Sequence, residues 1–426
     1  MTKEKKTRVI VLGGGISGLA LAWYLSKQNV DLLLLEKEAR VGGLIGSGVS
    51  EEFFFERGPR MFQESRSQPL LDLIDEVGLR SELIYADQNA RGRYIWHKEK
   101  LLRVPSNPLT MLFSPLTRPL LRALLTEWKK APFVQEESIW DFAVRRFNKK
   151  SAERLFDPLM TGIYAGDIKR LSVNACFPQM KRWEEEHGSL TRGFFIEKRR
   201  KSTLFSLQGG SERLIYALQE KLKGKILSGE KVGGLRVSSR GITVETTEGQ
   251  READHIFSAL PPHELSRLLG ANFDFPVRDV VTVNLGYRAG VLTKKGFGYL
   301  VPSHANQEIF GVIFDSHLFP QQNRSKDETR LTVMLPPGGD EQARALNALK
   351  RHLQIHQKPD FIYVTKITKA LPQFELGHAA RIEKLKSAAR TFSPHLHLVG
   401  NFLTGPSVSD AIATSRDAAS QVFGRL

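Results

Sequence analysis

The chain has 426 residues, of which 41% are hydrophobic and 25% are charged, a composition typical of a globular protein. This length predicts two or three domains, and no apolar run reaches the roughly twenty residues that span a bilayer. Lysine and arginine number 62 against 46 aspartates and glutamates, and the formal net charge of +16 favours an anionic partner such as nucleic acid, an anionic membrane or an acidic substrate.

The cysteine and histidine pattern argues against a metal site. The single cysteine, Cys176, excludes an intramolecular disulfide and a multi-cysteine metal centre, and its apolar neighbours predict a buried, inert thiol. His395 and His397 alternate on a predicted strand and should share a face, but no third ligand is evident nearby. We therefore expect no metal. The N-terminal MTKEKKT leaves no room for a signal peptide before the first strand, so we expect a cytoplasmic protein.

The segment from Arg8 to Gly43 has the order of a dinucleotide-binding unit. The apolar run Val9–Leu12 predicts a buried strand, and the helical spacing of Leu19–Ser26 predicts a helix. Between them three glycines fit G-x-G-x-x-G: Gly13, Gly15 and Gly18. A second apolar run, Leu32–Leu35, ends on Glu36. Strand, turn, helix, strand and acid in this order predict a bound dinucleotide, either FAD or NAD.

Each part of this motif has a physical role. Gly13 allows the tight turn, Gly15 lets a pyrophosphate approach the backbone, and Gly18 lets helix and strand pack closely. The N-terminus of the helix offers unpaired N–H groups and a positive dipole end to the phosphates. The Glu36 carboxylate can accept hydrogen bonds from ribose hydroxyls.

The middle of the chain predicts short helices with a cationic surface. After a hairpin that ends in the turn 57–60, a helix over Ser67–Val77 should stop at Gly78. The segment Leu116–Lys130 is predicted as one amphipathic helix whose apolar face holds Leu120, Leu121, Leu124, Leu125 and Trp128. Such a helix suits the headgroups of an anionic membrane, or it packs on the protein's own core. Residues 136–180 predict further helices.

The basic run Arg192–Lys201 predicts a solvated or membrane-facing loop, because no nucleic-acid-binding module surrounds it. A helix over Ser211–Leu222 and strands at 231–238, 242–246 and 253–260 then resume an α/β pattern. From 280 to 370 the pattern is mainly strands, with one helix near 340–355. The chain closes with a strand, a glycine turn and a helix from about Ser409, which should return to the first domain.

The opening motif continues with Arg40-x-Gly42-Gly43, and in this form it resembles the FAD-binding signature of the amine oxidase and phytoene desaturase superfamily. In that superfamily a C-terminal strand, glycine turn and helix complete the flavin site, as Leu398–Ala413 could here. The resemblance favours FAD over NAD. Non-covalent FAD is expected, because the C-terminal cysteine that carries covalent FAD in many amine oxidases has no counterpart here.

Within this superfamily the chain is similar to the protoporphyrinogen/coproporphyrinogen oxidase family over nearly its whole length. The resemblance rests on ordered motifs: VLGGGISGLA (11–20), ERGPRMF (56–62), GIYAGD (162–167), SxxACFP (172–178), LQGG (207–210), KGFGYLVPS (295–303), LTVML (331–335) and LPQFELGH (371–378). It implies an α/β fold of the glutathione-reductase/amine-oxidase type, with a Rossmann-like FAD-binding domain. The predicted parts are a discontinuous FAD-binding domain (1–88, 206–275 and 385–426), a helical, membrane-associating region (90–205) and a mixed-sheet substrate domain (276–384).

The resemblance also implies an activity and partners. It implies oxidation of protoporphyrinogen IX to protoporphyrin IX in haem biosynthesis, with six electrons passing through FAD to O2 and H2O2 as the other product. It implies monotopic binding to anionic lipid at the cytoplasmic face of the inner membrane. It allows a homodimer, and it includes no nucleic-acid partner.

The resemblance assigns site residues by position. The porphyrinogen would contact Phe297, Leu300 and Met334, while Arg93 would pair with a propionate, as an arginine can do through two hydrogen bonds. Arg60 and Gly166 would lie at the reacting rings, and the charge of Arg60 could stabilise reduced flavin. The FAD-binding positions are Gly13, Gly15, Ile16, Ser17, Gly18, Glu36, Lys37, Arg40, Gly42, Gly43, Gly58, Pro59, Val232, Gly400, Gly405, Val408, Ser409 and Asp410.

Three other functions remain open on sequence grounds. A coproporphyrinogen oxidase shares the same signatures but would need more cations for four propionates. An amine oxidase is disfavoured, because Cys176 lies mid-chain. A non-catalytic scaffold would bind a dinucleotide or a membrane without turnover. Two departures from the family, Ala379 in place of an aromatic residue and the turn TGPSVSD, put some FAD contacts in doubt but not the cofactor.

Overall fold

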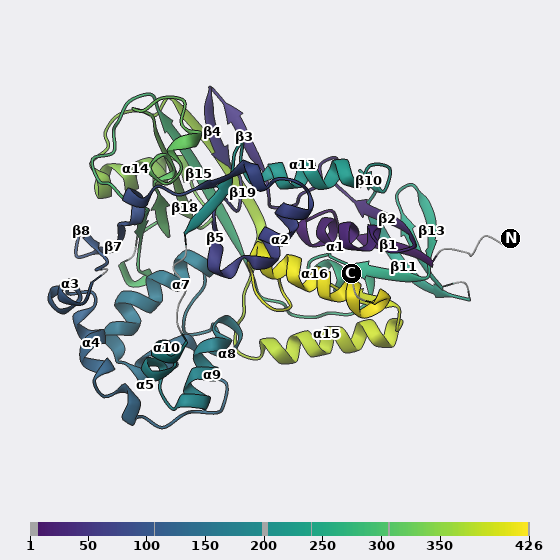
Figure 1. Cartoon of the computed structure of the whole chain (residues 1–426), viewed down its shortest axis with the longest axis horizontal. Coiled ribbons are helices and arrows are strands. Elements are labelled where there is room, and N and C mark those ends of the chain that lie inside the picture. Colours follow the sequence, from purple (N-terminus) through teal and green to yellow (C-terminus); the bar gives the residue numbers. More distant parts are fainter. Residues whose placement is uncertain (1–6, 106, 198–202, 240, 306, 425–426) are drawn as a thin grey trace.

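The computed structural model describes residues 7–105, 107–197, 203–239, 241–305 and 307–424. Figure 1 shows a sheet-and-helix part around β1 and β2, a second sheet around β15 and β18, and a group of helices below that sheet. Most of MTKEKKT and the end of the basic run Arg192–Lys201 lie outside the described residues.

The first sheet has five parallel strands in the order β10-β2-β1-β14-β20. Their bounds are β1 Thr7–Leu12, β2 Val30–Glu36, β10 Ile226–Ser228, β14 His255–Ser258 and β20 Leu396–Leu398. On β1, Val9 and Val11 join the core on one face, while Ile10 and Leu12 join the core on the other. A parallel sheet covered on both faces follows from this continuous apolar run.

Helices and a small sheet cover the two faces. One face packs against α1 (Ile16–Ser26), α2 (Gln68–Glu76), α11 (Glu212–Lys221) and α16 (Val408–Phe423). The other packs against α12 (Pro262–Leu268), α15 (His378–Phe392) and the antiparallel strands β11 (Val232–Ser238), β12 (Gly241–Thr246) and β13 (Gly249–Ala253). The predicted strand, turn, helix and strand over 8–36 are confirmed, and so is the return of the last helix to this sheet.

The second sheet has seven strands in the order β19-β15-β18-β17-β16-β7-β8. Their bounds are β7 Arg93–His97, β8 Lys100–Arg103, β15 Val277–Tyr287, β16 Gly298–Leu300, β17 Gly311–Ile313, β18 Thr329–Leu335 and β19 Phe361–Pro372. Neighbours are antiparallel except β16 and β7, which are parallel. The predicted helix near 340–355 is confirmed as α14 (Glu341–Leu353), which packs on this sheet.

The two faces of this sheet differ in chemistry. On β15, Val281, Val283 and Leu285 belong to the core beneath α14. Because side chains alternate along a strand, Thr282 and Asn284 lie on the opposite face, which is turned away from that core. Hydrogen bonds join this polar face to the segment after β4 in the first part, as described below. The sheet therefore has an apolar structural face and a polar face available to a site.

Short strands and turns link the two sheets. The linking strands are β3 (Ser47–Ser50), β4 (Phe53–Glu56), β5 (Phe62–Gln63), β6 (Leu83–Tyr85) and β9 (Leu204–Leu207). The linking helical turns are η1 (Glu64–Arg66), η2 (Arg80–Glu82), η3 (Gln88–Arg91), η6 (Ser303–Ala305), α13 (Asp315–Leu318) and η7 (Pro320–Gln322).

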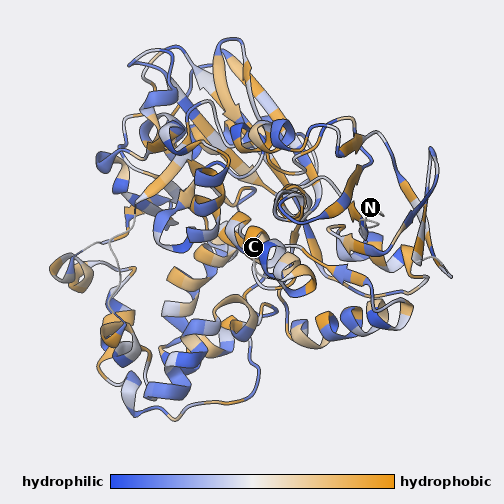
Figure 2. Ribbon diagram, turned by 45° about the vertical axis from the view of Figure 1, so that its right-hand side comes forward, coloured by the Kyte–Doolittle hydropathy of each residue, from blue (hydrophilic) through white to orange (hydrophobic). Residues whose placement is uncertain are grey.

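The helical part confirms the prediction of helices over 136–180. It comprises α3 (Pro108–Phe113), α4 (Arg118–Leu124), η4 (Glu127–Lys129), α5 (Ile139–Arg146), α6 (Lys149–Ser151), the π-helical turn η5 (Ala152–Phe156), α7 (Asp157–Tyr164), α8 (Val173–Cys176), α9 (Pro178–His187) and α10 (Leu190–Ile196). Figure 2 shows apolar residues on these outlying helices as well as in the sheets. Within the described residues no helix is both long and apolar enough to cross a membrane.

The prediction of a single helix over Leu116–Lys130 is wrong. The segment breaks between α4 and η4, because Glu127 turns inward and is fully buried. Its carboxylate accepts hydrogen bonds from Leu190 N (2.9 Å) and Ser189 Oγ (2.7 Å) and pairs with buried Arg146 at 2.8 Å. The apolar stripe is therefore divided: Leu125 and Trp128 are exposed, while Leu120, Leu121 and Leu124 are half-buried.

Two strands of the predicted helical segment 90–205 belong to a sheet. β7 and β8 form one edge of the seven-stranded sheet, where β7 pairs with β16. The predicted boundary between 384 and 385 falls inside α15, which packs Ile382, Leu385 and Ala389 on the first sheet. No local signal predicts these placements, since the parallel β7–β16 pair joins residues far apart in the sequence. The domain boundaries themselves stay a prediction.

Cys176 and the histidines differ in detail from expectation. Cys176 is half-buried rather than buried, and desolvation raises the pKa of its thiol to about 12, which keeps it inert. His395 and His397 do lie together, but a third histidine joins them: His255 Nδ1 is 3.0 Å from His397 Nε2. In the part of the chain that the structure describes, no group of side chains is arranged to hold a metal ion.

Candidate functional site

The glycine loop between β1 and α1 leaves room for a ligand. Gly13 has φ +99°, a conformation that favours glycine, and a Cβ on Gly18 would lie 1.9 Å from Gly13 O. A Cβ on Gly15 would meet no atom within 4 Å. Gly15 is also the N-cap of α1 and makes no side-chain cap, so the first N–H groups, at Ile16 and Ser17, face this open space.

A second glycine loop lies against the first. Gly42 N donates to Gly14 O at 2.7 Å, and Gly15 and Gly42 form a parallel bridge. A Cβ on Gly43 would stand 3.2 Å from Gly15 Cα. Side chains at these positions would narrow the space beside α1, so the two loops together form a cradle of bare backbone.

Arg40 holds the second loop in place. It donates to the carbonyl of Gly43 and to the carboxylate of Glu212, both at 2.8 Å. Glu212 also accepts from Ser47 N at 3.0 Å, and Ser47 Oγ donates to Glu56 at 2.6 Å. Burial raises the pKa of Glu56 to about 7. Arg40 therefore shapes the cradle, because its guanidinium is engaged by the protein.

The acidic end of β2 lies beside the cradle. Glu36 accepts hydrogen bonds from Gly14 N at 2.7 Å and Glu38 N at 2.9 Å, which fix its carboxylate near the glycine loop. Lys37 is exposed and its Nζ lies 3.9 Å from Glu38, while Val232 is buried at the start of β11. The proposed bond from Glu36 to ribose, and the roles of Lys37 and Val232, stay predictions.

The start of α16 completes this region. Ser407 and Asp410 form a capping box, in which each side chain bonds to the other residue's backbone N–H. Ser409 is buried, and its Oγ has no partner among the described residues. Ser415 Oγ donates to Ser17 O at 2.8 Å, so α16 lies directly on the N-terminal turn of α1. Two distant segments thereby meet at the cradle.

The glycines before α16 favour the conformation of this turn. Gly400 has φ +147°, and a Cβ on Gly405 would lie 2.3 Å from Asp410 Oδ2, where it would break the cap. Val408 is buried at the first position of the helix. This turn is thus built to place the first N–H groups of α16.

Arg60 joins the first part to the polar face of the second sheet. Its Nη1 lies 3.0 Å from Asp315 Oδ1 and donates to Thr332 Oγ1, and its Nη2 donates to Glu56 O at 3.4 Å. Asn284 Nδ2 donates to the same carbonyl at 3.2 Å. Since Asp315 compensates the guanidinium charge, Arg60 is held as a positioning residue. A direct role toward reduced flavin stays a prediction.

The turn before Arg60 packs on the second glycine loop. A Cβ on Gly58 would lie 2.1 Å from Leu44 O, so only glycine permits this contact. Arg57 N donates to Gly46 O at 2.7 Å, and Pro59 follows within the same turn. The predicted residues Gly58, Pro59 and Arg60 therefore lie between the cradle and the polar face of the sheet.

Across that face runs a row of predicted substrate contacts. Leu300 on β16, Gly311 on β17 and Met334 on β18 are direct partners in register. Paired residues of antiparallel strands project to the same side, so Leu300 and Met334 lie on either side of Gly311, where a Cβ would stand 2.4 Å from Tyr299 O. α7 packs on Leu300, since a Cβ on Gly162 would lie 2.4 Å from Leu300 Cδ2. The row forms an apolar floor on this face, covered at Leu300 by α7.

Arg93 and Phe297 lie next to this row, at the edge of the sheet. β7 brings Arg93 opposite Gly298, and its guanidinium carbon is 5.2 Å from the centre of the Phe297 ring. Phe297 and Met334 both pack against the buried cluster that includes Ile313 and Phe319. Arg93 is exposed and has no carboxylate partner among the described residues. The structure thus brings the four predicted substrate residues together, and the Arg93 guanidinium is available to pair with a carboxylate of a ligand. Arg91, a second exposed arginine two residues before Arg93, donates to Gln88 Oε1 at 3.5 Å.

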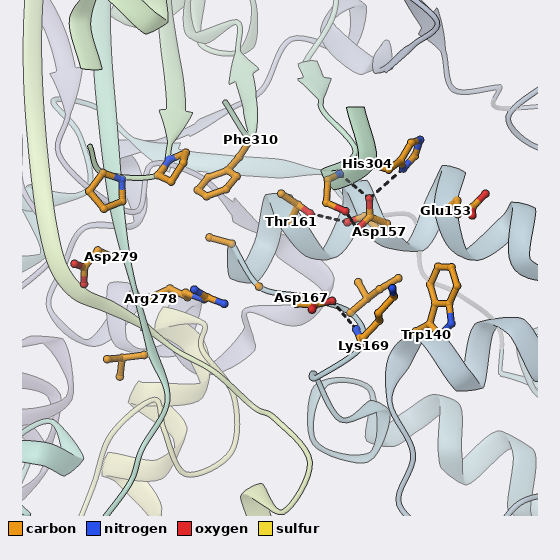
Figure 3. A pocket seen from close by; sticks show the side chains of 17 residues that line it. Trp140, Glu153, Asp157, Thr161, Asp167, Lys169, Arg278, Asp279, His304 and Phe310 are labelled. Carbon is orange, nitrogen blue, oxygen red and sulfur yellow. Dashed lines mark hydrogen bonds and ion pairs between the residues drawn. The ribbon is translucent and has the colours of Figure 1, made fainter. Parts of the chain in front are cut away.

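Gly166 lines a cavity of about 750 Å3 between α7 and the end of the sheet, shown in Figure 3. The cavity carries both signs of charge. Arg278 faces the cavity from the start of β15, and Lys169 faces it from the loop after α7. Asp167 and Asp279 add two carboxylates. Asp157 is engaged, because its carboxylate accepts from Ser303 N at 2.7 Å and Ser303 Oγ at 2.8 Å.

Comparison with known families gives one match over most of the chain. The family described as flavin-containing amine oxidoreductase matches residues 16–423. The chain belongs to this family. It is an FAD-dependent oxidoreductase, and the relatives below place it with the protoporphyrinogen and coproporphyrinogen oxidases.

Similar proteins match this flavoenzyme from end to end. The protoporphyrinogen oxidase of Bos taurus is 33% identical, and the match covers 98% of both chains; that of Homo sapiens is 32% identical with the same coverage. The coproporphyrinogen III oxidase of Bacillus subtilis is 26% identical over 99% of each chain. An Exiguobacterium structure, described provisionally as a protoporphyrinogen oxidase, has TM-score 0.87 at 22% identity over 99% of each chain, which shows the shared fold.

The residues of this flavoenzyme fit FAD. The cradle of Gly13–Gly18 and Gly42–Gly43 provides backbone N–H groups and open space for a pyrophosphate. A second helix N-terminus, that of α16, brings an unpartnered buried hydroxyl at Ser409. The turn of Gly58 and Pro59 then leads toward the sheet. These groups come from segments of the chain that are 398 residues apart at their contact between Ser17 and Ser415.

Sequence reasoning missed three residues of this flavoenzyme that the structure places in the site. Asp315, Thr332 and Asn284 form the network around Arg60, with Thr332 Oγ1 2.7 Å from Asp315 and 2.8 Å from Asn284. Thr332 and Asn284 lie within strands whose alternation could have put them on one face. No sequence pattern could have identified Asp315 as a site residue, since aspartate is common in short polar turns between strands.

Proposed function

We propose that this flavoenzyme oxidises protoporphyrinogen IX to protoporphyrin IX. The main support is the 33% identity with the Bos taurus protoporphyrinogen oxidase over 98% of both chains. This match includes the second sheet and the helical part as well as the FAD cradle. The apolar floor of Leu300 and Met334 suits a large, mainly apolar macrocycle, and Arg93 suits a propionate.

The protein's own residues would act by orientation and exclusion of water. When bound in the cradle, FAD would supply the redox chemistry of this six-electron oxidation, with O2 as the final electron acceptor and H2O2 as its product. Leu300, Gly311 and Met334 fix the plane of the macrocycle, and Arg93 fixes its rotation through one carboxylate. Arg60, locked by Asp315, sets the position of the turn that borders the cradle.

The second candidate is oxidation of coproporphyrinogen III to coproporphyrin III. Four propionates need further cations, and the cavity beside Gly166 has two, Lys169 and Arg278. Arg278 has no carboxylate partner among the described residues, whereas Lys169 lies over the Trp140 ring at 5.2 Å. The carboxylates of Asp167 and Asp279 in the same cavity oppose a second pair of propionates, so protoporphyrinogen stays the preferred substrate.

The test is anaerobic mixing of the yellow holoenzyme with each porphyrinogen in turn. The proposal expects bleaching of the flavin band and growth of porphyrin fluorescence, faster with protoporphyrinogen than with coproporphyrinogen. Admission of O2 should restore the yellow colour and release H2O2. A flavin that stays oxidised with both compounds rejects the function, and faster bleaching with coproporphyrinogen selects the second candidate.

We further propose that the helical part binds anionic membranes from the cytoplasmic side, as a peripheral protein. Four large apolar side chains on α3, at the C-cap of α4 and on α10 are at least 74% exposed: Leu109, Phe113, Leu125 and Phe195. Lys129 and Arg192 flank Trp128, a mixture that suits lipid headgroups.

Co-sedimentation with vesicles containing an anionic phospholipid tests this attachment. The variant Leu125→Ser/Phe195→Ser should lose most of its binding, while Val237→Ser, which removes an exposed side chain from β11 instead, should bind as the parent does. Equal binding by all three proteins would contradict the assignment.

We also propose a homodimer. Light scattering of the detergent-free protein tests it, because a measured molar mass equal to that of two chains is expected and the mass of one chain would contradict the proposal.

A further inference from the structure

The cavity beside α7 lies outside the row of predicted substrate residues. Thr161 lines it, while the next residue along the helix, Gly162, packs on Leu300 instead, and none of the four predicted substrate residues is part of the lining. The walls come from the helical part, from the start of β15 and from the segment after β18. Its volume of about 750 Å3 falls within the range of about 300 to 1,000 Å3 that is common for small-molecule sites. It is therefore a second space with a lining of its own.

Two cations of this cavity lack a carboxylate partner among the described residues. The Arg278 side chain makes no hydrogen bond or ion pair with any residue that the structure describes, and its guanidinium points into the cavity in Figure 3. Lys169 lies over the ring of Trp140, with 5.2 Å between Nζ and the ring centre, and pairs with no described carboxylate. Both positive charges are therefore available to a ligand.

The carboxylates of the same cavity are already engaged by the protein. Each of the four has a donor or a cation nearby: Asp157 has Ser303, Asp167 has Lys169 N, Asp279 has Lys369 N, and Glu153 has Lys149. The bond to Asp167 Oδ1 is 2.9 Å long and the bond to Asp279 Oδ1 is 2.7 Å long. The groups that stay without a partner in this cavity are therefore mainly donors.

The loop after α7 adds backbone donors to the two cations. The N–H groups of Gly166, Asp167 and Ile168 meet no acceptor among the described residues, although all three residues line the cavity and Gly166 and Ile168 are buried. Buried N–H groups without a protein acceptor normally pair with water or a ligand. Three consecutive donors beside two cations favour an anionic group that can accept several hydrogen bonds.

Another part of the lining is apolar. It is contributed by the second sheet and consists of Val277, Phe310, Pro336 and Pro337. One carboxylate can pair with Arg278 through two hydrogen bonds, whereas the four carboxylates of the cavity would repel a ligand with several anionic groups. The lining therefore matches a molecule that has one carboxylate and an apolar body.

We propose that this cavity binds a monocarboxylic acid with an apolar body, and that Arg278 pairs with its carboxylate. The carboxylate also accepts from the loop at Gly166, Lys169 is a second cationic contact, and the apolar body lies against Phe310. This site is separate from the proposed porphyrinogen site, so it does not depend on the proposed function. A fatty acid and an aromatic acid share this chemistry, and their relative affinities distinguish them.

Calorimetric titration of the holoenzyme with dodecanoate and with 2-naphthoate tests the site. At least one of the two acids should saturate at one molecule per chain. Arg278→Gln should bind that acid about tenfold more weakly, because the charge-assisted pair is lost, and Arg278→Lys should recover part of the affinity. The corresponding alcohols, dodecan-1-ol and 2-naphthol, have no carboxylate and should bind weakly and equally to the parent and to Arg278→Gln.

Two control variants separate the cavity from the rest of the surface. Arg182 is exposed on α9, lies outside the cavity and has no carboxylate partner among the described residues, so Arg182→Gln should bind the acid as the parent does. Leu125→Ser/Phe195→Ser should also bind it normally, because these exposed side chains lie outside the cavity lining. Inorganic phosphate, an anion without an apolar body, should not compete.

The outcomes that overturn the inference are distinct. Equal affinity of the parent and Arg278→Gln for the acid would remove the role of Arg278, and equal affinity for acid and alcohol would show that only the apolar body is bound. Binding of neither acid would reject the site. Displacement of the acid by protoporphyrin would make the cavity part of the porphyrin site and reject a separate one. The proposed function fails on a different result, namely a parent enzyme that oxidises neither porphyrinogen, whichever acid binds.

Discussion

Single residues decide how closely a ligand can approach this flavoenzyme. Gly15 and Gly18 belong to one motif, yet the structure gives them opposite surroundings. A side chain at 18 would collide with Gly13 O, whereas one at 15 would meet only open space. Gly18 therefore serves the fold, and Gly15 serves the ligand.

Substitution at Gly15 separates these roles. Its φ of −69° suits alanine, so Gly15→Ala should fold with an apo melting temperature close to that of the parent. The added methyl occupies the space for the pyrophosphate, so FAD should no longer raise the melting temperature, an effect worth about 2.7 kcal/mol at a hundredfold excess over Kd. Retained FAD-dependent stabilisation would contradict the cradle. Gly224→Ala, which disturbs φ +78° far from the cradle, is the contrasting control for backbone strain.

Arg93 should act on binding more than on chemistry. In Arg93→Gln the macrocycle loses one charge-assisted carboxylate contact, so KM for protoporphyrinogen should rise about tenfold while kcat changes little. Arg91→Gln is the matched control, because Arg91 is exposed on the preceding turn and bonds to Gln88. A KM unchanged in Arg93→Gln, or raised equally in both variants, would remove the assignment.

The histidine cluster should make the fold sensitive to acid. Burial and the neighbouring histidines lower the pKa of His397 to about 4 and lower that of His255. The unfolded chain binds protons at about 6.5, so the free energy of unfolding should fall as pH drops from about 6.5 to 4. In His397→Gln this slope should flatten, as measured by urea unfolding at several pH values. An unaltered slope would show that other groups dominate.

At the scale of elements, the helical part exposes some large apolar side chains and buries some charged ones. Large apolar side chains stand on its surface, while Glu127, Arg146 and Glu184 are fully buried beneath them. Arg146 pairs with Glu127 at 2.8 Å and with Glu184 at 3.4 Å, and Lys181 adds a third contact at 3.0 Å to Glu184. Ionic contacts thus hold together helices that expose large apolar side chains.

Breaking this network should unfold the helical part first. Glu127→Gln leaves Arg146 with less compensation and weakens the cap of α10, at a cost of about 3 kcal/mol. The change should lower the urea midpoint and vesicle binding, while flavin absorbance survives at lower urea. Glu185→Gln, an exposed change on α9, should alter neither property. Loss of flavin and helices in one transition would show that the helical part does not unfold separately.

At the scale of the whole molecule, sequence spacing predicted the helices and strands whose formation depends on neighbouring residues. β1, α1 and β2 follow from apolar runs, glycines and one acid, and α14 follows from its 3.6-residue spacing. The sequence predicts a helical region over 90–205, but β7 pairs with β16 in the second sheet, and this partner lies some two hundred residues away. Leu116–Lys130 has the apolar spacing of one helix, but the segment breaks because Glu127 turns inward to Arg146 and Leu190. At the site, predicted residues came from motifs, while Asp315 depended on tertiary contact alone.

The position of α16 also bears on how the protein is made. The cradle at Gly13–Gly18 is synthesised long before its other wall, which begins at Ser407; Ser17 and Ser415, which join the two, are 398 residues apart. The nascent chain therefore carries half of a cofactor site until α16 has been made. Tight capture of FAD must wait for this helix, so the yellow colour reports that translation has passed α16.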